Sequence, residues 1–138
     1  MLKRCSKCKI EKDISEFFKR KKNKDGLRYQ CKKCEQSDYL KYTQSDIGRN
    51  KILLRQHGIT LNQYNKMSKQ QKNKCLICGK KETSLDRYRH LKRLAVDHDH
   101  KTGKNRGLLC DRCNRALGYV YENKMILMKL INYIDIYK

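Results

Sequence analysis

The sequence predicts an α+β fold built from two small zinc-binding modules, a helical connector between them and a C-terminal helix. The eight cysteines form four Cys-x-x-Cys pairs, and none is left over. This spacing is typical of tetrahedral zinc sites, because two thiolates on one tight knuckle can reach the same ion. Short segments that predict strands lie before the second and fourth pairs, and the segment between the two units has helical periodicity. With 38% apolar and 36% charged residues the chain buries little surface, so bound zinc is expected to stabilise it.

The first module is expected to cover residues 1–36. Phe17 and Phe18 lie between its two cysteine pairs and are expected to form its small core. Asp25-Gly26 predicts a turn, the next three residues predict a short strand, and a helix is expected to begin at the second cysteine pair. Tyr29 lies in that strand and could stack on a base or wedge between bases, or it could belong to the same small core.

Residues 37–73 are expected to form the helical connector. Gly58 is suited to end its first helix, because glycine adopts the left-handed conformation of a C-terminal cap. Thr60 and Gln63 have the spacing of a capping box, which predicts that a second helix begins there. The first helix has apolar residues at heptad spacing, namely Leu40, Ile47 and Leu54.

The second module is expected to cover residues 74–122. It begins with a cysteine knuckle and a basic insert, and a short strand then ends in four polar residues. A second strand, Gly107-Leu-Leu, leads into the last cysteine pair, where a helix is expected to begin with Asn114 in its first turn. The four polar residues between the strands are Asp97, His98, Asp99 and His100.

Residues 123–138 predict an amphipathic helix. Its apolar stripe is expected to cover the zinc module, and the alternative is a homodimer surface, either here or on the connector helices. The stripe consists of Met125, Met128, Ile131 and Ile134.

The economical arrangement of the cysteines is sequential. The first four would hold one zinc ion and the last four a second, although the long gaps between pairs leave cross-pairing open. A Cys₄ shell is closed, so both ions should be structural. Iron–sulfur and redox sites also use such pairs, but neither explains the charge of the chain. The two expected sets are Cys5, Cys8, Cys31 and Cys34, and Cys75, Cys78, Cys110 and Cys113.

The chain is strongly basic, which favours nucleic acid as its partner. It has 35 lysines and arginines against 14 aspartates and glutamates, a net charge of +21. Two zinc ions and eight thiolates would add +4 and −8, leaving +17, and a field of that sign attracts polyanions. The alternatives are a solubility surface or binding to an anionic membrane. The side chains expected to contact DNA are Lys19, Arg20, Lys21, Lys22, Lys24, Arg28, Arg87, Arg89, Lys92, Arg93, Lys104 and Arg106.

The start of the chain and its cysteines favour the cytoplasm. Residues 1–4 are charged and run straight into a cysteine knuckle, unlike a signal peptide, and no apolar run approaches membrane-spanning length. Unpaired thiols that bind zinc also fit a reducing compartment. We therefore expect no membrane partner.

The polar residues after the first strand of the second module suit hydrolysis of a phosphodiester. His98 has the chemistry of a general base, since a histidine of near-neutral pKa can take a proton from water. The Asp97 carboxylate and the Asn114 amide oxygen are hard ligands that suit Mg²⁺. The other interpretations are a polar turn or a third zinc site for Asp97–His100, and a helix cap for Asn114.

These motifs resemble the phage recombination endonuclease VII family, part of the wider HNH, or His–metal finger, group. The resemblance covers residues 52–134. It implies a treble-clef-like ββα-metal element held by a Cys₄ zinc, with His98 as general base and with Asp97 and Asn114 binding catalytic Mg²⁺ or Mn²⁺. It also implies that His100 holds the scissile phosphate or the leaving group, and that cleavage leaves a 5′-phosphate and a 3′-hydroxyl. The motifs are Cys75-x-x-Cys78, Leu94-Ala-Val-Asp-His-Asp-His100 and Gly107-Leu-Leu-Cys-x-x-Cys113-Asn114-x-Ala-Leu-Gly118.

The expected function is therefore metal-dependent cleavage of duplex, nicked or branched DNA. A glutamate of the family's best-known junction-resolving member is replaced here by Leu117. The first module has Glu35 where the second has Asn114 and lacks an Asp-His pair, so it is expected to be a zinc scaffold without a cutting centre. The alternatives are a non-catalytic, zinc-dependent DNA-binding protein and an RNA-binding protein.

Two other histidines are given structural interpretations. His57 precedes Gly58 at a helix end, where a cationic side chain suits the helix dipole. His90 lies in the basic insert and could contact DNA. Neither is expected to be catalytic.

Overall fold

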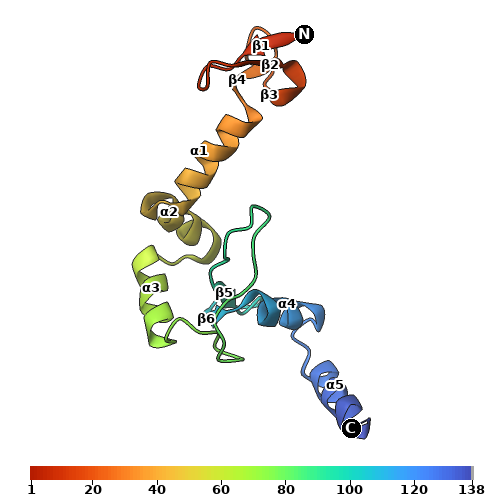
Figure 1. The fold of residues 1–138 in the computed structure, drawn as a ribbon. Coiled ribbons are helices and arrows are strands. Elements are labelled where there is room, and N and C mark those ends of the chain that lie inside the picture. The colour runs from red at the N-terminus through yellow and green to blue at the C-terminus, as the bar shows by residue number, and fades with distance from the viewer. Residues whose placement is uncertain (138) are drawn as a thin grey trace. The chain divides into compact units, whose positions relative to one another are not determined.

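A computed structural model describes residues 1–137 (Figure 1). The chain divides into two compact units, Met1–Leu53 and Leu54–Lys138. Each holds one set of four cysteines, and the fold is mixed α+β. No helix of the described residues is long and apolar enough to cross a membrane.

Unit 1 consists of two small antiparallel hairpins followed by a helix. β1 (Leu2–Arg4) pairs with β2 (Glu11–Asp13), and a 3-10 turn (Ile14–Glu16) leads into the second hairpin. That hairpin pairs β3 (Phe17–Lys19) with β4 (Leu27–Cys31), and α1 (Lys32–Gln44) begins directly after the third cysteine, as expected.

The core of unit 1 is built on its cysteines. Cys5, Cys31 and Phe17 are fully or almost fully buried in one cluster. Phe18 was also expected in this core, and that prediction is wrong, because 47% of its surface is exposed. Neighbouring residues of a strand point to opposite faces, so β3 buries only one of its two phenylalanines.

The expected first helix of the connector is two helices rather than one with a continuous heptad stripe. α1 ends at Ser45, whose extended backbone (ψ 153°) separates it from α2 (Asp46–His57). A side chain on Gly48 would begin 1.9 Å from the Tyr42 carbonyl oxygen, so only glycine allows this close turn. Ile47 and Leu54 are consequently 72% and 45% exposed instead of lining one buried face.

Unit 2 begins with the end of α2 and with α3 (Leu61–Gln70). The cap at Gly58 has the expected positive φ of 65°. The capping box is also present, since the Gln63 amide donates to the Thr60 hydroxyl oxygen at 3.2 Å. The Tyr64 hydroxyl then donates to the Leu94 carbonyl at 2.8 Å, which fastens α3 to the start of the next strand.

The rest of unit 2 is the expected ββα element. β5 (Ala95–His98) and β6 (Asn105–Leu109) pair antiparallel, and α4 (Asp111–Tyr119) contacts both strands. The register shifts between Asp97 and His98, which marks a bulge at the end of β5. Its buried apolar residues include Leu94, Val96, Leu108 and Leu109.

The C-terminal helix α5 (Lys124–Ile136) forms as expected, with Asn123 as its N-cap. The expectation that its stripe covers the zinc module is wrong, since Met125, Met128, Ile131 and Ile134 are all between 57% and 63% exposed. Ile126, Leu130 and Tyr133 are exposed as well, so apolar side chains surround this helix instead of forming one stripe. The homodimer alternative therefore stays a prediction.

Candidate active site

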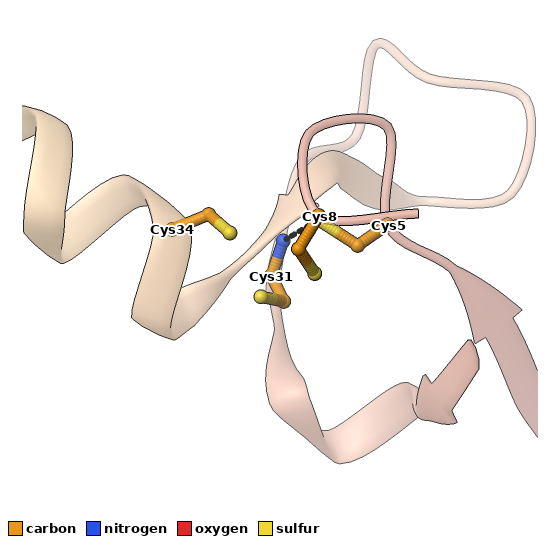
Figure 2. Close-up of side chains that lie close together, drawn as sticks. All are labelled: Cys5, Cys8, Cys31 and Cys34. Carbon is orange, nitrogen blue, oxygen red and sulfur yellow. Dashed lines mark hydrogen bonds between the residues drawn. The ribbon is translucent and has the colours of Figure 1, made fainter. Parts of the chain in front are cut away.

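The eight cysteines lie in two clusters that could each hold a metal ion. Within each cluster the four Sγ atoms lie within 4.8 Å of one another, and the grouping is the sequential one. Figure 2 shows the first cluster, in which Cys5 and Cys8 come from a knuckle, Cys31 from the end of β4 and Cys34 from α1. The Cys78 and Cys110 sulfurs are 3.8 Å apart. A tetrahedral zinc ion with bonds of about 2.3 Å spaces its sulfurs by about 3.8 Å, so the clusters fit zinc.

Peptide amides prepare some of these sulfurs to accept a metal. The Cys31 amide donates to the Cys5 sulfur at 3.3 Å (Figure 2). Burial raises the pKa of the Cys5 thiol, but the amide hydrogen bonds outweigh it and bring that pKa down to about 6. The same balance lowers the pKa of Cys75 to about 6. Burial and the neighbouring sulfurs raise the pKa of Cys34 and of Cys113 to about 12. A bound metal ion would remove those protons, because a coordinating thiol is deprotonated.

Asp97 lies on β5 and pairs with Arg106, which also pairs with a second carboxylate. The sequence did not predict this arrangement. The Asp97 side chain is 12% exposed, and its two oxygens accept from the Arg106 guanidinium at 2.7 and 3.0 Å. The same guanidinium donates to both oxygens of Glu122, at 2.8 and 2.9 Å. Arg106 was expected to contact DNA, and here it holds two carboxylates in place.

Glu122 reaches this position through an unusual turn after α4. Tyr121 and Glu122 both have positive φ, 51° and 53°. Residues other than glycine seldom adopt this conformation, and it costs free energy wherever it occurs. The hydrogen bonds from Arg106 lower the pKa of the Glu122 carboxyl, so it stays ionised. Glu122 lines a hollow of about 660 Å³ together with Arg106 and with His100, whose Nε2 lies 3.7 Å from the Glu122 carboxylate.

His98 lies between two other imidazoles. The His100 ring stacks on it, with ring centres 5.1 Å apart and planes 24° apart. On another side the His57 ring meets it edge-on, at 5.8 Å and 63°. Both arrangements lie within the range in which aromatic rings attract each other, so His98 has neighbours that restrict its orientation.

Asn105 fastens His57 in this position. It is the cross-strand partner of His98, and its side-chain amide donates to the His57 backbone carbonyl at 3.0 Å. The His57 Nδ1 atom is buried without a hydrogen-bond partner among the described residues. Burial, followed by the proximity of His98, lowers the pKa of His57. The expectation of a cationic helix-end histidine is therefore not matched, because these surroundings favour the neutral ring.

Asn114 lies in the first turn of α4, directly after Cys113. Its backbone amide donates to the Cys110 carbonyl at 3.0 Å, and the helix packs on the strand that carries Asp97. The second cysteine cluster therefore anchors the helix that presents Asn114. Asp99 has a structural place instead, since its carboxylate accepts the amides of Lys101 and Thr102 at 2.9 and 2.8 Å.

Some of the basic residues expected to contact DNA have partners within the chain. Arg28 pairs with Glu35 at 2.6 Å, and Lys92 with Asp111 at 2.7 Å. The Arg87 guanidinium lies 4.7 Å from the centre of the Tyr88 ring. Several others form no ion pair within residues 1–137, namely Lys19, Arg20, Lys21, Lys22, Lys24, Arg89, Arg93 and Lys104.

Sequence reasoning missed His57, Asn105 and Glu122. Each meets the site through a contact between distant parts of the chain. A local pattern offers no signal for such contacts. For His57 the nearest hint was the cap at Gly58, which fixes where α2 ends. For Glu122 the sequence offered none, because the turn after α4 places non-glycine residues at positive φ.

The sequence is similar to that of known proteins. Residues 50–136 match the family model of recombination endonuclease VII. Over 83 residues the chain is 39% identical to the Gene 59 protein of Mycobacterium phage D29, covering 59% of this chain and 47% of that protein. Over 87 residues it is 39% identical to the Gene 59 protein of Mycobacterium phage L5, with the same coverage. The chain thus spans about half the length of the curated relatives it matches.

A solved structure is also similar. It is the crystal structure of the ββα-Me type II restriction endonuclease Hpy99I, at 25% identity and a TM-score of 0.41, covering 99% of this chain and 66% of that one. The family model alone covers well over half of the present sequence. The chain belongs to the recombination endonuclease VII family.

Proposed function

We propose that this protein is a metal-dependent endonuclease that hydrolyses phosphodiester bonds in DNA. Its active site would consist of Asp97, His98 and Asn114. One observation carries the proposal: the ββα element has a carboxylate and an imidazole at consecutive positions on β5, packed against the helix that bears Asn114. Family membership supports the same chemistry. The basic charge supports a polyanionic substrate.

The donor set of Asp97 and Asn114 fits a hard divalent cation. A carboxylate has about four lone-pair sites, and Arg106 takes one hydrogen bond on each oxygen of Asp97. Lone pairs therefore remain for Mg²⁺ or Mn²⁺ while Arg106 keeps the carboxylate in place. When bound, such an ion would stabilise the charge that develops on the phosphate and the leaving oxygen.

The protein's own residues would move the proton and hold the phosphate. As general base, His98 takes a proton from the attacking water as the water oxygen bonds to phosphorus. The bond from phosphorus to the 3′ oxygen breaks, the 3′ oxygen takes a proton from solvent water, and a 5′-phosphate remains on the other fragment. His98 then returns its proton to solvent. His100 stacks on His98 and is 73% exposed in its side chain, so it is available to hold the phosphate or the leaving group.

Supercoiled plasmid provides the test of this function. The wild-type protein with Mg²⁺ should nick or linearise the plasmid, and the protein passed through a desalting column without divalent ions should not. A branched duplex serves as a second substrate. Binding of both substrates without any cleavage in Mg²⁺ or Mn²⁺ would favour the non-catalytic DNA-binding alternative. Preference for single-stranded RNA over DNA would favour the RNA-binding alternative.

His57→Ala should slow cleavage about 10-fold with little change in DNA affinity. The variant removes the ring that meets His98 edge-on, and small losses of alignment at a general base are costly in rate. Single-turnover cleavage with saturating protein measures the rate, and fluorescence anisotropy of labelled duplex measures the affinity. His57→Phe keeps an aromatic edge and should recover most of the rate. Equal defects in both variants would contradict a positioning role for the ring.

A further inference from the structure

The two cysteine units share one architecture in detail. In each, the residue after the second cysteine has positive φ, 61° at Lys9 and 67° at Gly79, and its amide donates to the carbonyl of the first cysteine at 3.0 Å. In each, the residue after the first cysteine donates to the residue two before the third cysteine, from Ser6 to Tyr29 and from Leu76 to Leu108. By these matching hydrogen bonds, β3, β4 and α1 of unit 1 correspond to β5, β6 and α4 of unit 2.

The aligned positions carry different chemistry in unit 1. The place of Asn114 is taken by Glu35, and the Arg28 guanidinium occupies that carboxylate at 2.6 Å. β3 carries Phe18 and has no histidine. Unit 1 therefore repeats the frame of the proposed cutting centre without the histidine that the proposal uses as general base.

In place of those groups, unit 1 holds an exposed aromatic ring among cations. Phe18 is 47% exposed, although its neighbour Phe17 is 3% exposed in the core. The Arg28 guanidinium and the Lys32 ammonium lie 5.7 and 5.6 Å from the centre of the Phe18 ring. Phe18 lies between two paired positions of the hairpin, Phe17 and Lys19, at a shift in the register. Because its backbone is held on both sides, less conformational entropy is lost when a ligand covers the ring than on a free chain.

The loop of the same hairpin adds four cations that form no ion pair within residues 1–137. The loop is held in shape, because the Arg20 amide donates to the Gly26 carbonyl at 2.6 Å and the Gly26 amide donates to the Asn23 carbonyl at 2.9 Å. Gly26 has a φ of 69°, as this tight turn requires. The cations of the loop are Arg20, Lys21, Lys22 and Lys24.

We propose that unit 1 binds an unpaired DNA strand on this surface, which we call the Phe18 surface and define as Phe18, Arg28, Lys32 and the cations of the 20–26 loop. A base stacks on Phe18 and the basic side chains hold the flanking phosphates. Charge alone would suit duplex and single strand equally, but the ring favours the single strand, because only an unpaired base offers its face for stacking. The inference rests on the proposed function only in taking DNA as the polyanion, and it extends that function to substrates with a single-stranded segment.

The test measures DNA binding by the full chain in a His98→Ala background, so that cleavage plays no part. The probes are a labelled oligothymidylate and a labelled duplex of equal length, followed by fluorescence anisotropy. Phe18→Ala should weaken oligothymidylate binding about 5- to 100-fold and change duplex binding less than about 2-fold. Phe18→Tyr keeps a stacking face and should bind as the parent does.

Ile10→Ala is the matched control, since Ile10 is also an apolar residue of unit 1 and is 57% exposed. It should leave both affinities unchanged. Zinc content and circular dichroism establish that each variant is folded. Equal losses of duplex and single-strand binding in folded Phe18→Ala would overturn stacking in favour of simple charge attraction. Unchanged binding would show that Phe18 serves only its own cation contacts. The nuclease proposal survives either result, since the plasmid assay tests it separately.

Discussion

His98→Ala is expected to slow DNA cleavage by about 100- to 10,000-fold while zinc content and DNA affinity stay as in the wild type. The side chain supplies the proton acceptor in the proposed mechanism, and no other imidazole is placed to take over without moving. His57 is fastened through its backbone to Asn105, and His100 is stacked on the ring that the variant removes. The buried hydrophobic side chains of this hairpin are its leucines and valine, so the truncation leaves the core intact.

His90→Ala is the matched control for loss of an imidazole from unit 2. His90 lies in the basic insert, where its side chain is 50% exposed and its Nδ1 is 3.6 Å from an Asp86 oxygen. Its removal should change the cleavage rate less than about 2-fold. The measurement is single-turnover cleavage of plasmid at saturating protein, with anisotropy for binding. Wild-type cleavage by folded His98→Ala would remove His98 from the mechanism.

The features predicted best from the sequence are those determined by residues that lie close together along the chain. The grouping of the cysteines follows from knuckle spacing, and the helix starts follow from caps that involve neighbouring residues. The α1–α2 break was missed, because Leu40, Ile47 and Leu54 continue the heptad across Ser45, where the close approach at Gly48 ends the helix. Periodicity describes which residues share a face, but it does not report where a backbone turns.

The catalytic roles of Asp97, His98 and Asn114 stay predictions from the sequence, whereas the residues that contact them from distant parts of the chain were missed. Asp97 and His98 follow an apolar strand and Asn114 follows a cysteine knuckle, so local patterns together with the family resemblance were enough to propose them. His57 and Glu122 meet the site through Asn105 and Arg106, which belong to β6. Arg106 shows the limit most clearly: among 35 basic residues in a chain of +21, charge suggested a DNA contact, whereas two carboxylates at under 3 Å make it a structural clamp.

Cys110→Ser is expected to abolish cleavage by unfolding the ββα element. Cys110 is 6% exposed, directly follows β6, serves as the N-cap residue of α4 and shares a cluster with three other sulfurs. The hairpin buries few apolar side chains, so it depends on the metal, and small zinc modules unfold without it. The zinc content measured with a chromogenic chelator should fall from two ions per chain to about one. Far-ultraviolet circular dichroism should show the loss of helix.

Cys34→Ser is the matched variant in unit 1, where the corresponding cluster should lose its ion by the same reasoning. Because the proposed cutting centre belongs to the other compact unit, plasmid cleavage with Mg²⁺ should persist in this variant. Binding of the oligothymidylate should weaken, since the hairpin that carries Phe18 would lose its anchor. Retention of full cleavage by Cys110→Ser, or equal loss of cleavage in both variants, would contradict this assignment of separate tasks to the two cysteine clusters.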